Sequence, residues 1–201
     1  MGPGSGPACD LRLNTTLTDE ERRRYQDPAV IRRLIAGART VAIVGMSADP
    51  QKASSFVASY LQHEGYRIVP VNPRGGQVLL GETIYPDLAS IPFPVDVVDV
   101  FRPPFEAPTF ARQALAIGAK ALWLQLRIVN FEAAEIATAG GLDVVMDRCL
   151  KIEHGRFNGT LHWGGMNTEI ISARKARVAT SSPAASHTGL ADLRTNLKPT
   201  P

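Results

Sequence analysis

A short loop that begins at Gly45 gathers the side chains in this sequence best suited to bind an anion. It follows the apolar run Thr40–Val44 and contains one glycine, one lysine and three serines, namely Gly45, Ser47, Lys52, Ser54 and Ser55. Glycine lets the chain turn tightly with its backbone close to a ligand. Hydroxyls and a lysine can bind oxyanions, and the first amides of a following helix attract negative charge. The spacing therefore predicts a phosphate or pyrophosphate site; the alternative is a plain turn in which Ser54 or Ser55 only caps the helix.

Polar segments also follow four further apolar runs. They are Asn72-Pro73-Arg74, Arg102-Pro103-Pro104, Gln125-Leu126-Arg127 and Asp147-Arg148-Cys149. The carboxyl ends of parallel strands meet at one edge of a sheet, and open parallel sheets bind ligands beyond that edge. We therefore expect these segments and the first loop to form one ligand-binding rim.

The first loop lacks the signatures of two common nucleotide sites. Ser47 and Pro50 stand where the later glycines of Gly-x-Gly-x-x-Gly belong, and Gly-x-x-x-x-Gly-Lys-[Ser/Thr] is absent. Asn72 stands where an acidic residue would bind the ribose of NAD. Arg74 could meet a ribose phosphate, which NADP and coenzyme A both carry, or could be a solvated loop residue. The sequence thus disfavours NAD binding and P-loop hydrolysis, and it leaves NADP and coenzyme A open.

Candidate catalytic side chains gather after the last apolar run, at Asp147, Cys149, Glu153 and His154. A cysteine beside an imidazole can act as a nucleophile. Cys149, however, directly follows a predicted buried strand and is five residues from His154, which favours a structural cysteine. Adding His162 gives no standard metal-ligand spacing, so no metal site is predicted. Whether the protein is an enzyme is left undecided, with binding alone favoured.

Alternating strands and helices must position these residues. Apolar runs predict strands at 40–44, 67–71, 95–101, 121–126 and 142–146, and helical patterns fall after Ser54, at 105–117 and at 131–139. Two helices precede them, one with Thr18 and Glu21 at capping-box spacing and one from Pro28 to Gly37. Residues 74–94 are predicted as a long loop, 151–163 as a polar, glycine-containing stretch, and 167–175 as a closing helix. This alternation predicts an α/β fold with a doubly wound, parallel five-stranded sheet and flanking N-terminal helices.

Composition limits the classes of partner. The chain has 201 residues, a net charge of +3 and a pI of about 9.1, which suits one domain with one core. Arg22, Arg23 and Arg24 follow three acidic residues that would pair with them on a helix, so nucleic-acid binding is disfavoured. No apolar run is long enough for a membrane helix, and the glycine- and proline-rich start is no secretory signal, so we expect a cytoplasmic protein that does not enter the membrane. Residues 1–17 are expected to be flexible, 18–175 to form the domain, and 176–201 to be a disordered tail.

Six segments together resemble the family of small CoA-binding-domain proteins. They are Val44-Gly45-Met46-Ser47, Gly65-Tyr66-x-Ile68-Val69-Pro70-Val71-Asn72-Pro73, Val95-Asp96-x-Val98-x-Val100-Phe101-Arg102, Gly118-Ala119-Lys120, Trp123-Leu124-Gln125 and Val145-Met146-Asp147-Arg148-Cys149. Proteins of this family look like a free-standing N-terminal domain of the succinyl-CoA synthetase alpha subunit. The resemblance spans roughly residues 25–175. Each motif alone is weak, but six in order are specific.

The resemblance implies a Rossmann-like sheet that holds coenzyme A, or an acyl-CoA, across the strand ends. The implied cofactor-binding residues are Gly45, Met46, Ser47, Lys52, Ser54 and Ser55 for the phosphates, Asn72 and Pro73 for the adenosine side, and Phe101, Arg102 and Gln125 along the ligand. Met46, Ala53 and Arg127 depart from the usual family pattern, and Arg127 stands where glycine is common at the pantetheine end. The resemblance covers only the nucleotide-binding domain of the synthetase, whose phosphohistidine chemistry belongs to a second domain, so we do not expect that chemistry in these 201 residues. An NADP-dependent oxidoreductase or an acyl-CoA-processing enzyme on the same fold is the alternative, and a homo-oligomer or a protein partner stays open.

Overall fold

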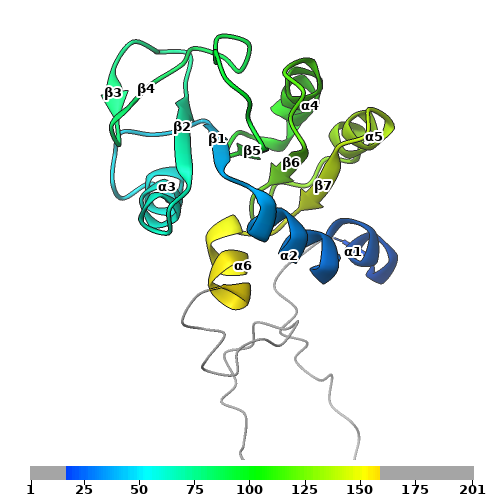
Figure 1. Ribbon diagram of the computed structural model, residues 1–201. Helices are drawn as coiled ribbons and strands as arrows, with labels where there is room; N and C mark the ends of the chain where they lie inside the picture. The colour runs from blue at the N-terminus through cyan, green and yellow to red at the C-terminus, as the bar shows by residue number, and fades with distance from the viewer. Residues whose placement is uncertain (1–16, 159–201) are drawn as a thin grey trace, which may run out of the picture. The chain divides into compact units, whose positions relative to one another are not determined.

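The computed structural model describes residues 17–158, which contain a five-stranded parallel sheet (Figure 1). The strands are β1 (Thr40–Val44), β2 (Arg67–Val71), β5 (Val97–Val100), β6 (Ala121–Leu124) and β7 (Asp143–Met146). They lie in the order β2-β1-β5-β6-β7, and every neighbouring pair is parallel. The predicted doubly wound α/β fold is therefore confirmed.

Helices cover both faces of this sheet (Figure 1). One face packs against α1 (Asp19–Tyr25), α4 (Ala107–Ala116) and α5 (Phe131–Ala139), whose buried residues share one apolar cluster. The other face packs against α2 (Pro28–Gly37), α3 (Ala53–His63) and α6 (Leu150–Phe157), which contribute to a second cluster. Because side chains alternate along a strand, β5 sends Val98 and Val100 to the first cluster and Val97 to the second.

The N-terminal helices begin where local sequence signals predict. The Thr18 side chain accepts a hydrogen bond from the Glu21 amide while the Glu21 carboxylate accepts one from the Thr18 amide, so the predicted capping box is present. Helix α2 has Pro28 in its first turn and the Asp27 side chain as its cap. These capping side chains accept hydrogen bonds from backbone amides that would otherwise be unpaired at the start of each helix.

The structure corrects the prediction in three places. Helix α6 occupies a stretch that was predicted only as polar and glycine-containing. A small antiparallel hairpin, β3 (Val78–Leu79) with β4 (Glu82–Thr83), lies in the predicted loop 74–94. The predicted helix at 105–117 is a 3-10 turn at Pro104–Glu106 followed by α4. The predicted closing helix at 167–175 lies outside the described residues.

No helix in the described part of the chain combines the length and apolar character that crossing a membrane would require.

Candidate functional site

The connections of the sheet reverse direction between β1 and β5. From β1 the chain moves outward to β2, then returns to the opposite side of β1 to form β5, and continues to β6 and β7. The loops that leave β1 and β5 therefore diverge to opposite faces and leave a crevice at the carboxyl edge. This topological switch point is where an open parallel sheet binds its ligand.

Gly45 brings the two diverging loops into direct contact. Its φ is +83°, a left-handed conformation that favours glycine. A Cβ at this position would lie 2.9 Å from Arg102 Cδ and 3.1 Å from the carbonyl oxygen of Phe101. The Phe101 amide also donates to the carbonyl of Val44 at 2.9 Å. Gly45 is thus required by the turn and by the close approach of the loop after β5.

The serines of the first loop hold its backbone in place. The Ser47 amide donates to Ser54 Oγ at 3.1 Å, and the Ser55 hydroxyl donates to the carbonyl of Ser47. Ser54 and Ser55 are both buried, and Ser47 Oγ accepts a hydrogen bond from the Asp49 amide. The serines that were predicted to bind phosphate are therefore engaged within the loop, which preorganises it.

Helix α3 starts at Ala53, two residues before the predicted start after Ser54, and its start is open. Lys52, rather than Ser54 or Ser55, is the N-cap residue, and it makes no side-chain hydrogen bond to the helix. The prediction of a serine cap is therefore wrong, because both serines lie inside the first turn and point into the loop. Lys52 is exposed, and the described residues provide no side chain that caps α3. An uncapped helix N-terminus with a lysine beside it attracts an anion.

The loop after β2 is fastened to the first loop by Asn72. Its Nδ2 donates to the carbonyl of Met46 at 2.8 Å, and its Oδ1 accepts from the Arg74 amide at 3.0 Å. Met46 is 2% exposed and packs in the apolar core, so only its backbone belongs to the loop. Pro73 and Arg74 are exposed beside it. Asn72 thus fixes the geometry of the rim.

Arg102 lies at the switch point with its guanidinium already paired. Its Nε and Nη2 donate to the two carboxylate oxygens of Glu106 at 2.9 and 2.8 Å, and this pairing raises the pKa of Arg102 further. The side chain of Arg102 is 43% exposed, so the pair is held at the surface. Phe101, immediately before it, is half-buried against the core.

Gln125, directly after β6, is buried and bonded to a carboxyl group inside the sheet. Its Nε2 lies 2.9 Å from both carboxyl oxygens of Asp99, which is fully buried on β5. Burial raises the pKa of Asp99 to about 8, against the smaller opposing effect of the Gln125 hydrogen bond. Asp99 was not predicted as a site residue from the sequence, although it is the one charged residue within the apolar run Val97–Val100.

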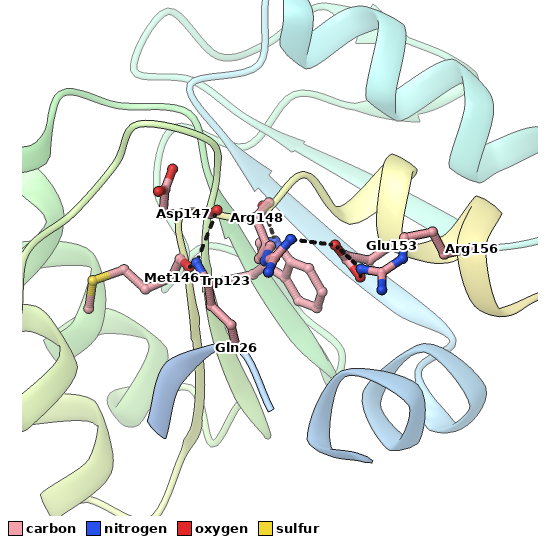
Figure 2. A network of polar contacts seen from close by, with 7 residues as sticks. All are labelled: Gln26, Trp123, Met146, Asp147, Arg148, Glu153 and Arg156. Atoms are coloured by element: carbon pink, nitrogen blue, oxygen red, sulfur yellow. Dashed lines mark hydrogen bonds and ion pairs between the residues drawn. The ribbon is translucent and has the colours of Figure 1, made fainter. Parts of the chain in front are cut away.

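Behind the loop after β7, α6 buries a group of charged side chains (Figure 2). The Glu153 carboxylate, 1% exposed, lies 2.7 Å from Arg156 Nη1 and 3.5 Å from Arg148 Nη1. Trp123 Nε1 donates to the carbonyl of Arg148 at 2.7 Å, and Gln26 Nε2 donates to the carbonyl of Met146 at 2.9 Å. These bonds position the end of β7 from both sides. Figure 2 shows Glu153 lying between the two guanidinium groups.

Cys149 and His154 do not form a catalytic pair. His154 Nδ1 shares a hydrogen bond with the Tyr60 hydroxyl at 3.0 Å, and the imidazole packs edge-on against Tyr60 and Tyr66. Burial lowers the pKa of His154 and raises that of the Cys149 thiol. A thiol with a raised pKa is a weak nucleophile at neutral pH.

Comparison with known protein families finds one whose model matches most of the described chain. The family model described as "CoA binding domain" matches residues 39–155, more than half of the chain and all of the strands. The chain belongs to this CoA-binding-domain family. The match contains every segment on which the resemblance was based.

The chain is also similar to individual proteins and solved structures. The uncharacterized protein YneT of Bacillus subtilis is 35% identical over 126 residues, which is 63% of this chain and 93% of YneT. A solved structure from Thermus thermophilus is 37% identical with a TM-score of 0.63, over 65% of this chain and 98% of that one. A dinucleotide-forming acetyl-coenzyme A synthetase of Candidatus Korarchaeum cryptofilum is 25% identical with a TM-score of 0.50, over 58% of this chain and 27% of the synthetase.

In this member of the CoA-binding-domain family, the predicted site residues have three kinds of placement. Lys52 and Pro73 are exposed, Ser47, Asn72, Phe101 and Arg102 are half-buried, and Met46, Ser54, Ser55 and Gln125 are buried. All lie in segments that leave the carboxyl ends of β1, β2, β5 and β6. Asp99, whose carboxyl group holds Gln125 at this rim, was not predicted from the sequence, and Glu153 was predicted only as a catalytic candidate. A single acid within an apolar strand run was the signal that could have identified Asp99.

Proposed function

We propose that this protein binds coenzyme A or an acyl-CoA at the carboxyl edge of its sheet, with the phosphates on the loop between β1 and α3. The observation that carries the proposal is the uncapped start of α3, with exposed Lys52 beside it, at the switch point between β1 and β5. Such an arrangement offers unpaired amides, a positive dipole end and a mobile cation to one anion. Membership of the CoA-binding-domain family supports coenzyme A as the nucleotide.

The remaining rim residues have distinct proposed roles. The loop between β1 and α3, here called the phosphate loop, keeps its shape through the contacts already described, which involve Gly45, Met46, Ser47, Ser54 and Ser55. Because the serine hydroxyls take part in these contacts, few of them remain for the ligand. Asn72 and Pro73 shape the adenosine side, while Phe101, Arg102 and Gln125 lie along the path toward the pantetheine arm. Lys52 is then the side chain that contributes most directly to phosphate affinity.

Binding without catalysis is the form of this function that the geometry favours. The Cys149 thiol has a raised pKa, and His154 is hydrogen-bonded to Tyr60. The candidate nucleophile and the candidate base therefore do not assist each other. The acetyl-coenzyme A synthetase that shares the fold is much longer, and this chain spans 27% of it. A carrier, sensor or regulator of CoA would need no more than the site described here.

Calorimetric titration tests the proposal directly. Coenzyme A and acetyl-CoA should bind, whereas NADP and ATP should bind at least tenfold more weakly. Replacing Lys52 by alanine should weaken CoA binding by about two- to fivefold and flatten its salt dependence, because an exposed lysine contributes about 0.2–1 kcal/mol to an ion pair.

Lys120→Ala is the matched control. Lys120 is also exposed, but it pairs with Asp96 at the amino end of the sheet, with Nζ 2.7 Å from Oδ1. Its replacement should leave CoA affinity within twofold of the unchanged protein. Absence of binding by both CoA forms would show that the proposed function is wrong. Equal effects of the two lysine variants would reject only the placement of the phosphates.

A further inference from the structure

Asp99 is a carboxyl group buried in the middle of the sheet, and within residues 17–158 no cation forms an ion pair with it. Its solvent exposure is 0%, and its strand neighbours in register are Ile43 on β1 and Trp123 on β6. Its side-chain hydrogen bonds in the described part of the chain go to Gln125 alone. A charged carboxylate in such surroundings is strongly disfavoured, because an amide does not replace the solvation that the charge loses.

This burial keeps Asp99 protonated at neutral pH, with a pKa of about 8. Among the described residues, the Cys149 thiol, from the segment that leads into α6, interacts with Asp99 electrostatically. The pKa of that thiol is raised first by its own burial, with a smaller contribution from Asp99. The elements on either side of Asp99 in the sheet contribute the apolar Ile43 and Trp123. Asp99 therefore changes its charge close to physiological pH.

Gln125 links this carboxyl group to the ligand-binding edge. It is 4% exposed, and within residues 17–158 its amide has no hydrogen-bond partner other than Asp99. An ionised carboxylate only accepts hydrogen bonds, so it holds the N–H of the Gln125 amide in the observed orientation and leaves the amide oxygen unpaired. A protonated carboxyl must donate its O–H, and the amide oxygen of Gln125 is the acceptor available to it after a half-turn of the amide. The proton on Asp99 thus decides which end of the amide is left for a ligand.

We propose, resting on the proposed function, that Gln125 recognises a carbonyl oxygen of the CoA ligand through an N–H that protonated Asp99 leaves free. Two carbonyl sources exist in such ligands, the amides of the pantetheine arm and the thioester of an acyl group. Asp99 is then a positioning residue and Gln125 the residue that contacts the ligand. When Asp99 ionises, the amide turns its oxygen outward and the hydrogen bond to the carbonyl is lost.

Titrations of the unchanged protein at pH 7 and pH 9 with three ligands test this inference. The ligands are acetyl-CoA, the thioether S-ethyl-CoA, which lacks the thioester carbonyl, and adenosine 3′,5′-bisphosphate, which lacks the pantetheine arm. The dissociation constant for acetyl-CoA should rise about three- to tenfold more between the two pH values than that for the bisphosphate, the equivalent of one hydrogen bond. A rise for both CoA forms assigns the contact to pantetheine, and a rise for acetyl-CoA alone assigns it to the thioester. Equal changes for all three ligands would overturn the inference.

Two variants separate positioning from simple structural support. In Asp99→Asn the new amide can donate to Gln125 at every pH, so the extra rise between pH 7 and pH 9 should disappear. In Gln125→Met the side chain keeps its size but has no donor, so the affinity difference between the carbonyl ligand and the bisphosphate should fall about three- to tenfold at pH 7. Retention of the pH effect in Asp99→Asn would refute the role of Asp99.

Failure of this inference can be told apart from failure of the proposed function. If neither CoA form binds at pH 7, the function is wrong and the inference falls with it. If both bind and neither pH nor the two variants change their affinity relative to the bisphosphate, the function stands and the inference alone is wrong.

Discussion

The two faces of the central sheet bury different kinds of side chain. On the face covered by α1, α4 and α5, the two long helices meet the sheet through fully buried alanines, which are Ala107, Ala111, Ala114, Ala133, Ala134 and Ala137. On the face covered by α2, α3 and α6, the buried set includes polar and charged side chains, which are Ser54, Ser55, Asp99, Glu153, His154 and Arg156. One face is an apolar packing surface, and the other combines packing with polar contacts.

This difference indicates how the fold divides stability from ligand positioning. Alanine lets helices approach a sheet closely and buries no polar group, so the first face stabilises the domain at little cost. Burying Glu153 or Asp99 costs solvation free energy that their partners only partly restore. These groups lie on the face where hydrogen bonds also hold the loop between β1 and α3, Gln125 and the end of β7 in place.

The largest predicted effect comes from breaking the buried ion group. Replacing Glu153 by glutamine leaves Arg148 and Arg156 buried without their shared carboxylate, and the free energy of unfolding should fall by about 3–5 kcal/mol. Urea denaturation followed by circular dichroism measures this change. The matched control is Glu132→Gln, which removes an exposed partner of Arg112 and should cost at most about 1 kcal/mol. Similar losses for the two variants would mean that the buried group contributes no more than a surface pair.

On the face covered by α1, α4 and α5, overpacking should lower the stability of the domain without changing the candidate site. Ala111 on α4 is fully buried, so Ala111→Leu should lower the free energy of unfolding by about 1–3 kcal/mol. Ala116, in the last turn of the same helix, is exposed, and Ala116→Leu should change it by less than about 0.5 kcal/mol. CoA affinity measured well below the unfolding temperature should be the same in both. A loss of affinity in Ala111→Leu would show that the two faces are not independent.

The sequence predicted the apolar parts of this architecture well. The bounds of β1, β2, α2 and α5 were predicted to the residue, because continuous apolar runs and caps such as Asp27 define them locally. The contact of Gly45 with Phe101 and Arg102 was not predicted, because it depends on β5 lying beside β1, and local sequence patterns do not define the order of the strands in the sheet.

The polar face was the part that sequence patterns could not predict. Helix α6 has no apolar stripe of the usual kind, since Glu153, His154 and Arg156 turn inward and pair with residues distant in sequence or with each other. The inward bonds of Ser54 and Ser55 depend in the same way on the folded shape of the loop. Buried polar contacts between remote segments leave no periodic signal in the sequence, so these contacts could be identified only from the structure.

The buried Asp99 predicts a pH dependence of stability that belongs to the polar face alone. Its pKa is about 8 in the folded protein and about 4 when unfolded, so folding takes up a proton between these values. Stability from this residue is full below pH 4 and falls as the pH rises toward 8, by up to about 1.4 kcal/mol per pH unit. Urea denaturation at pH 5, 6.5 and 8 should show this slope, and Asp99→Asn should remove it. An unchanged slope in the variant would mean that Asp99 ionises in the folded protein as readily as in the unfolded chain.

The smallest loss of stability should come from the half-exposed Arg102–Glu106 pair at the switch point, where removing the carboxylate should raise the affinity for the ligand. Glu106→Gln removes the partner of Arg102, and the free energy of unfolding should fall by only about 0.3–0.5 kcal/mol, since the guanidinium is half-exposed and solvated. The freed guanidinium then lies beside Gly45 and the phosphate loop, so the affinity for adenosine 3′,5′-bisphosphate should rise about two- to threefold at low salt. Arg102→Gln in the same titration should give no increase, because it removes the cation itself. If both variants weaken binding equally, the Arg102–Glu106 pair supports the loop as a unit. The charged side chains at this edge would then contribute by holding the loop in position, as the buried charged side chains of α6 do, and not by attracting the ligand.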